Sequence, residues 1–230
     1  MDSLFIILLI LLIVIILVFY FRNFRSPKKA KSNDLYTDGL NLLLKGDNKG
    51  ALEILRKVVK QDSNHINAYI QLGNILRKEN PEQAAKIHQS LTVRFNLPIN
   101  SQIDIHQALA LDYEKMNRLD LAKHEAERVL RLENKNTWGF KFLLKIAERT
   151  EDWDMASQLG KKYQKLVNKR DKEELSKFEV YQGLKSQKNG KTEEALSFFR
   201  KAIKICPENG MPFRHIGDIY ESSRELVKAV

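Results

Sequence analysis

The chain has 230 residues, enough for one globular domain or one array of structural repeats but too few for a second, enzyme-sized domain. With only 10 glycines and 5 prolines, its composition favours helices over strands. Its single cysteine, Cys206, excludes an internal disulfide framework and a zinc site built from pairs of cysteines within this chain. We therefore expect an all-α protein.

The formal net charge of +10 would suit a nucleic-acid-binding protein if it were spread over a folded surface. Five of the positive charges instead lie in one short segment, at Arg22, Arg25, Lys28, Lys29 and Lys31. This segment directly follows an apolar run and accounts for half of the surplus. We therefore expect no nucleic-acid partner.

Residues 4–21 read LFIILLILLIVIILVFYF, a stretch without a single charge. A helix of this length just crosses the hydrocarbon core of a bilayer, which is about 30 Å thick. A cleaved secretory signal would need a basic start, a shorter apolar core and a small-residue cleavage site, all of which are missing here. A buried helix of a soluble domain is the other alternative, but uninterrupted apolar runs of this length are rare there.

The basic residues also predict the orientation of this anchor. No Lys or Arg precedes the apolar run, so the positive-inside rule places the chain after it in the cytoplasm. We predict a single-pass transmembrane anchor at residues 4–21, a basic juxtamembrane linker at 22–32 and a repeat domain at 33–230. The lysines of the linker can also rest on anionic lipid.

Small and apolar residues recur along residues 33–230 with a period of about 34 residues. In a unit that begins at residue 176, positions 8, 20, 24, 27 and 32 are Gly183, Ala195, Phe199, Ala202 and Pro207. This is the pattern of the tetratricopeptide repeat, in which small residues let two antiparallel helices approach and apolar residues fill the gap between them. The pattern predicts an α-solenoid, a right-handed superhelix of helix pairs.

The same frame gives five complete units and a partial sixth, at residues 32–65, 66–98, 103–136, 137–170, 176–209 and 210–230. The last unit stops near position 21, before the residue that would cover the apolar face of Phe213, Ile216 and Tyr220. Because repeat arrays normally end in a capping helix with a polar outer face, we expect the natural chain to continue.

Several strings resemble one family, the bacterial lipopolysaccharide assembly protein B family. They are GLNLLLKGDNKGALEIL in the first unit, LGNILRKENPEQAAKIHQSL in the second and LLKIAERTEDWDMASQLGKKYQKL in the fourth, whose inter-helix turn carries a family-like Trp. The apolar segment and basic linker before them complete the likeness, which covers essentially the whole chain.

The resemblance implies a single-pass protein of the bacterial inner membrane whose bulk faces the cytoplasm. It implies protein partners, namely a membrane-bound AAA+ protease and proteins of lipopolysaccharide synthesis or transport. In this family the repeats help the protease degrade the deacetylase that commits carbon to lipid A. The family also carries a C-terminal rubredoxin-like zinc ribbon with two pairs of cysteines, which this sequence lacks, so we expect no cofactor in this chain.

The residues themselves offer no catalytic or metal site. The histidines are scattered over different units without metal-ligand spacing: His65, His88, His106, His124 and His215. His88, at position 24 of its unit, is expected to face the core with its ring partly buried. The sequence contains no motif of a phosphate-binding loop or a nucleophile elbow. We interpret Cys206, directly before Pro207, as a structural residue rather than a nucleophile. We expect a binding protein rather than an enzyme.

In a tetratricopeptide array the recognition surface is the concave wall formed by the first helix of each pair. In phase, this wall consists of Asn67, Ile70, Asn74 and Arg77 in the second unit, Gln107, Leu111 and Glu114 in the third, and Trp138, Lys141, Lys145 and Glu148 in the fourth. The mixture suits a peptide or helix with apolar and acidic groups, and Trp138 is the preferred anchor. An ordinary solvated face is the competing interpretation.

Two functions remain open at this stage. One is a regulatory adaptor that joins a protease or biosynthetic enzyme to its client at the membrane. The other is a general assembly factor or co-chaperone for another inner-membrane complex.

Overall fold

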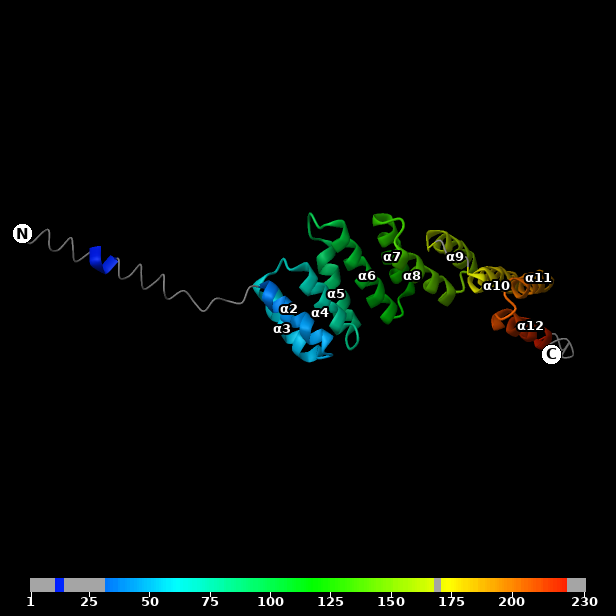
Figure 1. The fold of residues 1–230 in the computed structure, drawn as a ribbon, viewed down its shortest axis with the longest axis horizontal. Coiled ribbons are helices and arrows are strands. Elements are labelled where there is room, and N and C mark those ends of the chain that lie inside the picture. Colours follow the sequence, from blue (N-terminus) through cyan, green and yellow to red (C-terminus); the bar gives the residue numbers. More distant parts are fainter. Residues whose placement is uncertain (1–10, 15–31, 168–170, 223–230) are drawn as a thin grey trace, which may run out of the picture. The chain divides into compact units, whose positions relative to one another are not determined.

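The computed structural model describes residues 11–14, 32–167 and 171–222. All regular elements in these ranges are helices, which confirms the all-α prediction. Ordered in pairs, they are α2 (Ser32–Leu44) with α3 (Asn48–Gln61), α4 (Ile66–Leu76) with α5 (Pro81–Thr92), α6 (Ile99–Lys115) with α7 (Leu119–Leu132), α8 (Thr137–Arg149) with α9 (Trp153–Val167), α10 (Lys172–Lys188) with α11 (Thr192–Ile205), and then α12 (Gly210–Ser222) (Figure 1).

The helix pairs follow the predicted repeat frame. Two first helices are longer than the frame predicts: α6 begins at residue 99 rather than 103, and α10 at 172 rather than 176. Trp153, predicted to lie in the turn of the fourth unit, is the first residue of α9. The Asp152 side chain caps the start of this helix by accepting a hydrogen bond from the Met155 backbone N–H.

The turns inside the pairs share one backbone feature. A residue with positive φ follows the first helix in four of them: Gly46 (78°), Asn117 (58°), Glu151 (55°) and Gly190 (74°). This left-handed residue ends the helix and reverses the chain direction. The turn of the second pair, residues 77–80, is one residue longer than the turns of the other four pairs and enters α5 through Pro81. Asn80 caps the helix by accepting a bond from the Gln83 N–H.

The chain divides into two compact units, Met1–Leu72 and Gly73–Val230, each described by itself. In the first unit α2 packs on α3 through Gly39. A Cβ on Gly39 would lie 3.2 Å from Cδ2 of the Leu55 side chain, which is fully buried. The predicted core positions Ala51, Leu55 and Val58 are all buried, as the repeat frame requires.

The second unit contains the later pairs, and its packing repeats the same contact. Gly183 on α10 lies against the ring of Phe199 on α11, so closely that a Cβ would overlap the ring. Ala195 and Ala202 are fully buried beside Phe199. Cys206 ends α11 and is buried, in line with the expectation that it is structural.

Helix α12 packs on this cluster more than the sequence suggested. Ile216 and Tyr220 contact the core around Phe199, and Ile219, which the repeat frame did not select, is buried there. Phe213 is half exposed. Ile216 and Tyr220 stay half-buried beside α11, so the expectation that later residues cover the face of Phe213, Ile216 and Tyr220 stays a prediction.

The predicted membrane anchor falls largely outside the described residues. Of residues 4–21 the structure describes 11–14, which are helical, and of the predicted linker 22–32 it describes Ser32, which already belongs to α2. Among the described ranges, no helix combines the length and the apolar character needed to cross a membrane. The anchor stays a prediction from the sequence.

Two helical glycines provide a matched test of the packing. Gly183→Ala should lower the free energy of unfolding by about 1–2 kcal/mol, since overpacking against Phe199 costs about 1–3 kcal/mol and the helix gains up to about 1 kcal/mol. Gly217→Ala should raise it by about 0.5–1 kcal/mol, because nothing lies within 4 Å of the added methyl group. Urea denaturation followed by circular dichroism measures both, and equal effects at the two sites would contradict the assigned helix contacts.

Candidate functional site

The predicted partner-binding residues lie on the first helix of each pair. We call the surface formed by Gln107, Leu111 and Glu114 of α6 and by Trp138, Lys141, Lys145 and Glu148 of α8 the helix-A face. It belongs entirely to the second compact unit. Asn67 and Ile70 belong to the first unit and are not placed relative to this face.

Ionic contacts join α6 to α8 across the helix-A face. Lys145 Nζ lies 2.6 Å from Glu114 Oε1, and Arg149 Nη1 donates to the same oxygen over 3.0 Å. The second Arg149 nitrogen, Nη2, donates to Asn117 Oδ1 over 3.0 Å. One carboxylate thus binds two cations that are one helical turn apart on the next first helix.

A second set of contacts joins α8 to α10. The Tyr181 hydroxyl donates to Glu148 Oε1, and Lys177 Nζ lies 3.5 Å from the same oxygen. Burial and the neighbouring Glu148 carboxylate raise the pKa of the Tyr181 hydroxyl, so the hydroxyl stays protonated and remains a hydrogen-bond donor. Three successive first helices are therefore linked by side chains on this face.

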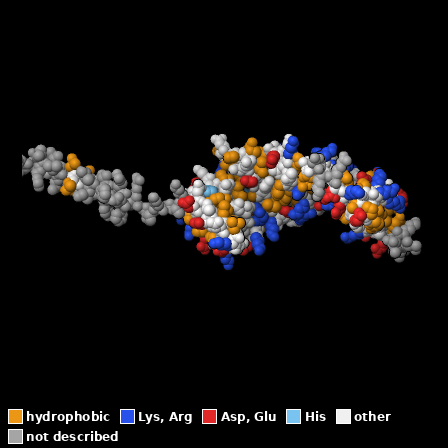
Figure 2. Space-filling model, in the orientation of Figure 1, with side chains coloured by type: hydrophobic (Ala, Val, Ile, Leu, Met, Phe, Trp, Pro, Cys, Tyr) orange, Lys and Arg blue, Asp and Glu red, His pale blue; other side chains and the backbone are white. Residues whose placement is uncertain are grey.

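The cations of the face project further into solvent than the carboxylate between them. The Lys145 side chain is 58% exposed and the Glu114 side chain 13%. Over the surface drawn in Figure 2, basic and acidic side chains are interspersed. A partner approaching α6 and α8 therefore meets the outer cations first, which favours acidic groups on that partner.

The two remaining α8 residues are held by aromatic contacts. Trp138 is half-buried and stacks on Phe142, with ring centroids 4.8 Å apart. Lys141 Nζ lies 5.5 Å from the centroid of the Tyr163 ring on α9, within the range of a cation–π contact. Trp138 keeps part of its ring at the surface, whereas Lys141 contacts its own pair rather than the neighbouring first helices.

In the second predicted unit, one residue is buried and two are held by side chains of this chain. Ile70 is buried, so it offers no surface for a partner. Arg77 and Asn74 bind one another, with Arg77 Nη2 donating to Asn74 Oδ1 over 2.6 Å. Asn67 is exposed, as expected. The reason for the difference at Arg77 is a buried cluster that the sequence analysis missed.

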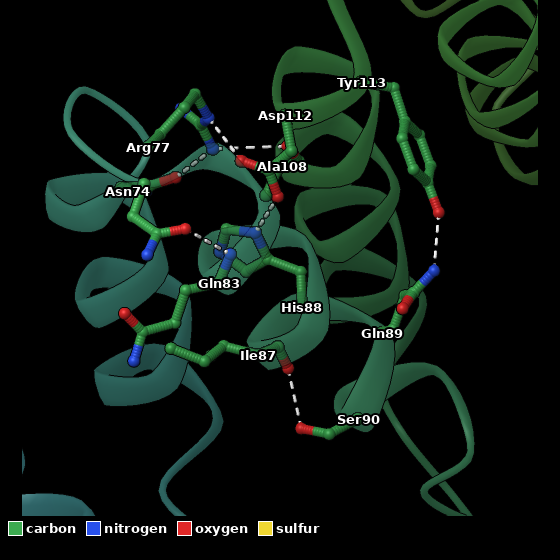
Figure 3. Close-up of polar contacts among 11 residues, drawn as sticks. Asn74, Arg77, Gln83, Ile87, His88, Gln89, Ser90, Ala108, Asp112 and Tyr113 are labelled. Atoms are coloured by element: carbon green, nitrogen blue, oxygen red, sulfur yellow. Dashed lines mark hydrogen bonds and ion pairs between the residues drawn. The ribbon is translucent and has the colours of Figure 1, made fainter. Parts of the chain in front are cut away.

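Asp112 of α6 lies at the centre of this cluster, fully buried (Figure 3). Arg77 Nε donates to its Oδ1 over 2.6 Å, and His88 Nδ1 lies 2.5 Å from its Oδ2. Arg77 also donates to the Ala108 carbonyl oxygen over 3.2 Å. The carboxylate thus has a partner on each oxygen, which a buried charge requires.

His88 is fully buried rather than partly buried, because Gly73 makes room for it. A Cβ on Gly73 would overlap the imidazole ring. Asp112 stands in the run QALALDY, and a charged residue inside such an apolar stretch of a helix was the signal that could have revealed the cluster. Since Arg77 is engaged there, it is a structural residue rather than a free recognition residue.

The other histidines lie apart from one another. His65 caps α4 by accepting a bond from the Ala68 N–H, His106 contacts Glu125, and His215 stacks on Phe199. In the part of the chain that the structure describes, no three His, Cys, Asp or Glu side chains come together as metal ligands.

Comparison with known proteins supports the fold. The family model of the tetratricopeptide repeat matches residues 186–209. A tetratricopeptide-repeat protein from Parabacteroides merdae has a TM-score of 0.62 at 16% identity, over 86% of this chain and 76% of that one. YrrB, described as a tetratricopeptide-repeat protein with an unusual peptide-binding site, has a TM-score of 0.58 at 18% identity, over 79% and 89% of the two chains.

Among curated proteins, lipopolysaccharide assembly protein B of Escherichia coli (strain K12) is 22% identical over 213 residues, which are 91% of this chain and 55% of that protein. The chain thus spans about half the length of the curated relatives it matches. Together these matches show the fold, a tetratricopeptide-repeat α-solenoid.

The buried cluster predicts a large difference between two aspartates. Asp112→Ala should lower the free energy of unfolding by about 3–5 kcal/mol, because Arg77 and His88 lose the carboxylate that compensates their burial. Asp154→Ala removes a more exposed pair with Lys185, 2.8 Å apart, and should cost less than about 1 kcal/mol. If urea titration gave both variants the same stability, Asp112 would not be the centre of a stabilising cluster.

Proposed function

We propose that this protein is a membrane-anchored adaptor that holds other proteins at the cytoplasmic surface of a bacterial inner membrane. Its repeat array binds a client through the helix-A face, and the client is the deacetylase that commits carbon to lipid A. A membrane-bound AAA+ protease then degrades the client, so that lipopolysaccharide supply follows demand. The observation that carries the proposal is the similarity to lipopolysaccharide assembly protein B along 91% of the chain.

The chemistry of the helix-A face supports a protein client. Lys145 and Arg149 offer exposed cations on α8, and Trp138 offers part of an indole ring about two and three turns away on the same helix. A segment of the client that carries acidic and apolar side chains can contact both the cations and the indole ring. The linked first helices keep these side chains in fixed register, which lowers the entropy lost on binding.

The apolar segment at residues 4–21 adds the location. An anchor confines the array to a thin layer beneath the bilayer and so raises its effective concentration toward other membrane proteins, even when each contact is weak. A membrane-bound protease is a partner of this kind.

Depletion of the protein in a Gram-negative host tests the proposal. The half-life of the lipid A deacetylase should lengthen and total lipopolysaccharide should rise, because the protease no longer receives its client. Re-expression of the full chain at native level should restore both, whereas a chain lacking residues 1–32 should not. If the half-life of the deacetylase stays equally short after depletion, the adaptor function is contradicted. A general assembly scaffold would then explain the protein better.

Two substitutions test the helix-A face directly. With the full chain in nanodiscs, Lys145→Ala and Trp138→Ala should each weaken deacetylase binding about tenfold, the effect of losing roughly 1.4 kcal/mol. Lys161→Ala, an exposed lysine on α9, is the matched control and should leave the affinity unchanged. Calorimetric titration gives the affinities and circular dichroism the fold. Equal affinities for all the variants would place the client elsewhere.

A further inference from the structure

The second helices of the repeats carry a recurring basic pattern at positions 25, 26 and 29. The first unit has Arg56, Lys57 and Lys60 there, the fourth Lys161, Lys162 and Lys165, and the fifth Arg200, Lys201 and Lys204, while the third has Arg128 and Arg131 at positions 26 and 29. Because successive residues of a helix are about 100° apart, these positions lie opposite the packed positions 20, 24 and 27. The pattern therefore marks the outer side of each second helix.

In the second compact unit the pattern falls on α7, α9 and α11. We call the surface formed by its eight cations the outer band: Arg128, Arg131, Lys161, Lys162, Lys165, Arg200, Lys201 and Lys204. Arg128 is half-buried and the other seven are exposed. Since the chain reverses direction twice in each repeat, the three helices run the same way, and their basic C-terminal halves lie along one edge of the unit. The matching residues of α3 belong to the first unit and are not placed relative to the outer band.

The cations of the outer band are not compensated by carboxylates. In the ranges that the structure describes, none of the eight has an ion pair. Arg200 donates to the Tyr220 hydroxyl over 3.0 Å, and Lys201 Nζ lies 4.9 Å from the centroid of the Phe198 ring. Neither partner is a carboxylate, so the positive charge of the band stays available to another molecule.

Acidic residues are also scarce around the band. Between positions 25 and 29, α9 and α11 contain none, and α7 contains Glu127. In the connections that follow, Glu133, Asp171 and Glu208 contact groups of the same connection or of the next helix. A surface that only keeps a protein in solution usually mixes charges of both signs. One sign over three helices indicates an anionic partner that extends over several repeats.

Helix stability explains one of the three positions. A cation in the last turn of a helix interacts favourably with the helix dipole, and Arg131, Lys165 and Lys204 lie there. The effect falls off within that turn, whereas positions 25 and 26 come one turn earlier. Stability therefore does not account for the cations at positions 25 and 26.

The neighbouring repeat presents apolar side chains at the same edge. Counted from His88 at position 24, position 29 of that unit is Val93, which is 74% exposed, and Phe95 in the connection after it is 92% exposed. The phosphates of a nucleic-acid duplex would contact the cations but leave Val93 and Phe95 in water. The boundary of a bilayer offers anionic headgroups and, beneath them, acyl chains. The combination therefore favours a bilayer as the partner.

We propose that the outer band rests on the anionic lipid of a bilayer. The C-terminal halves of α7, α9 and α11 face the headgroups, and Val93 and Phe95 reach the boundary with the acyl chains. Each Lys or Arg near such a surface is attracted to it, and the attractions add up over the band. The helix-A face belongs to the first helices, so this contact leaves it open to a protein partner.

The inference goes beyond the proposed function, because the contact needs neither a client nor a protease. The predicted anchor at residues 4–21 would keep the array close to such a surface and so raise the effective concentration of lipid around the band. The attraction itself comes from the described residues of the second compact unit.

Trace acylation of lysines tests the contact on the full chain. The chain is placed in nanodiscs of phosphatidylcholine alone or of an equimolar mixture with phosphatidylglycerol, and mass spectrometry gives the acylation rate of each lysine. Lys162, Lys165 and Lys201 should react about fivefold more slowly in the anionic nanodiscs, because headgroups shield them and hold them in the charged form. Lys141 and Lys145 of the helix-A face should react equally in both.

Two triple variants locate the attraction. With Lys161→Gln, Lys162→Gln and Lys165→Gln together, the acylation rate of Lys201 should return most of the way to its value in neutral nanodiscs, because losing three cations weakens the attraction about a hundredfold. Lys115→Gln, Lys188→Gln and Lys191→Gln together are the matched control. They remove the same charge from exposed lysines at the turns inside the pairs and should leave Lys201 protected.

A dye tests the apolar part of the contact. In a Cys206→Ala background, Phe95→Cys labelled with an environment-sensitive dye should shift its emission to the blue in anionic nanodiscs only. Leu121→Cys, from an exposed leucine at the start of α7, is the matched control and should show no shift. Circular dichroism checks the fold of each variant.

Four results would overturn the proposal. They are equal acylation of the band lysines in both kinds of nanodisc, equal slowing at Lys141 and Lys145, an unshifted dye at residue 95, and slowing by duplex DNA in neutral nanodiscs as large as that by anionic lipid. The last result would identify a nucleic-acid surface instead.

The assay separates this inference from the proposed function. It contains no deacetylase and no protease, so its failure leaves the depletion experiment to decide the adaptor function. A chain that does not enter neutral nanodiscs would contradict the anchor, while the comparison of the two lipid compositions would still test the outer band.

Discussion

A close contact between positions 8 and 24 is the constraint on which three of the helix pairs depend. In three pairs a glycine on the first helix lies against a large side chain on the second: Gly39 against Leu55, Gly73 against His88 and Gly183 against Phe199. The third pair has alanine at both positions, Ala110 and Ala126, and both are fully buried. In the three glycine pairs, the large side chain on the second helix fills the space that the glycine leaves, so that the two helices can pack at native density.

One repeat places a histidine where this contact normally holds an apolar residue, and the consequences extend into the next repeat. His88 needs a partner in the core, and Asp112 of α6 provides it. Asp112 in turn needs a second partner, which is Arg77. A buried carboxylate left alone would cost several kcal/mol, so the three side chains stabilise the fold only as a set. The same pairing takes Arg77 out of the recognition surface.

The surface proposed for recognition consists of residues that the core does not require. On the helix-A face, Lys145 and Arg149 keep their cationic groups toward solvent while Glu114 lies beneath them. The connection between α5 and α6 is two residues longer than the connections before α4, α8 and α12. Both features leave the packing of helix pairs unchanged, which allows the surface of a tetratricopeptide scaffold to specialise while its core stays regular.

The sequence by itself determined the helix pairs and their core, because a small residue at position 8 and an apolar one at position 24 recur at a spacing that only paired helices explain. It also selected the residues of α6 and α8 that form the helix-A face. Only the tertiary structure decided how these residues pair, since Glu114 meets Lys145 and Arg149 through the stacking of successive repeats. The same holds for Arg77: its guanidinium pairs with Asp112, 35 positions further along the chain, and a repeat position does not specify such a partner.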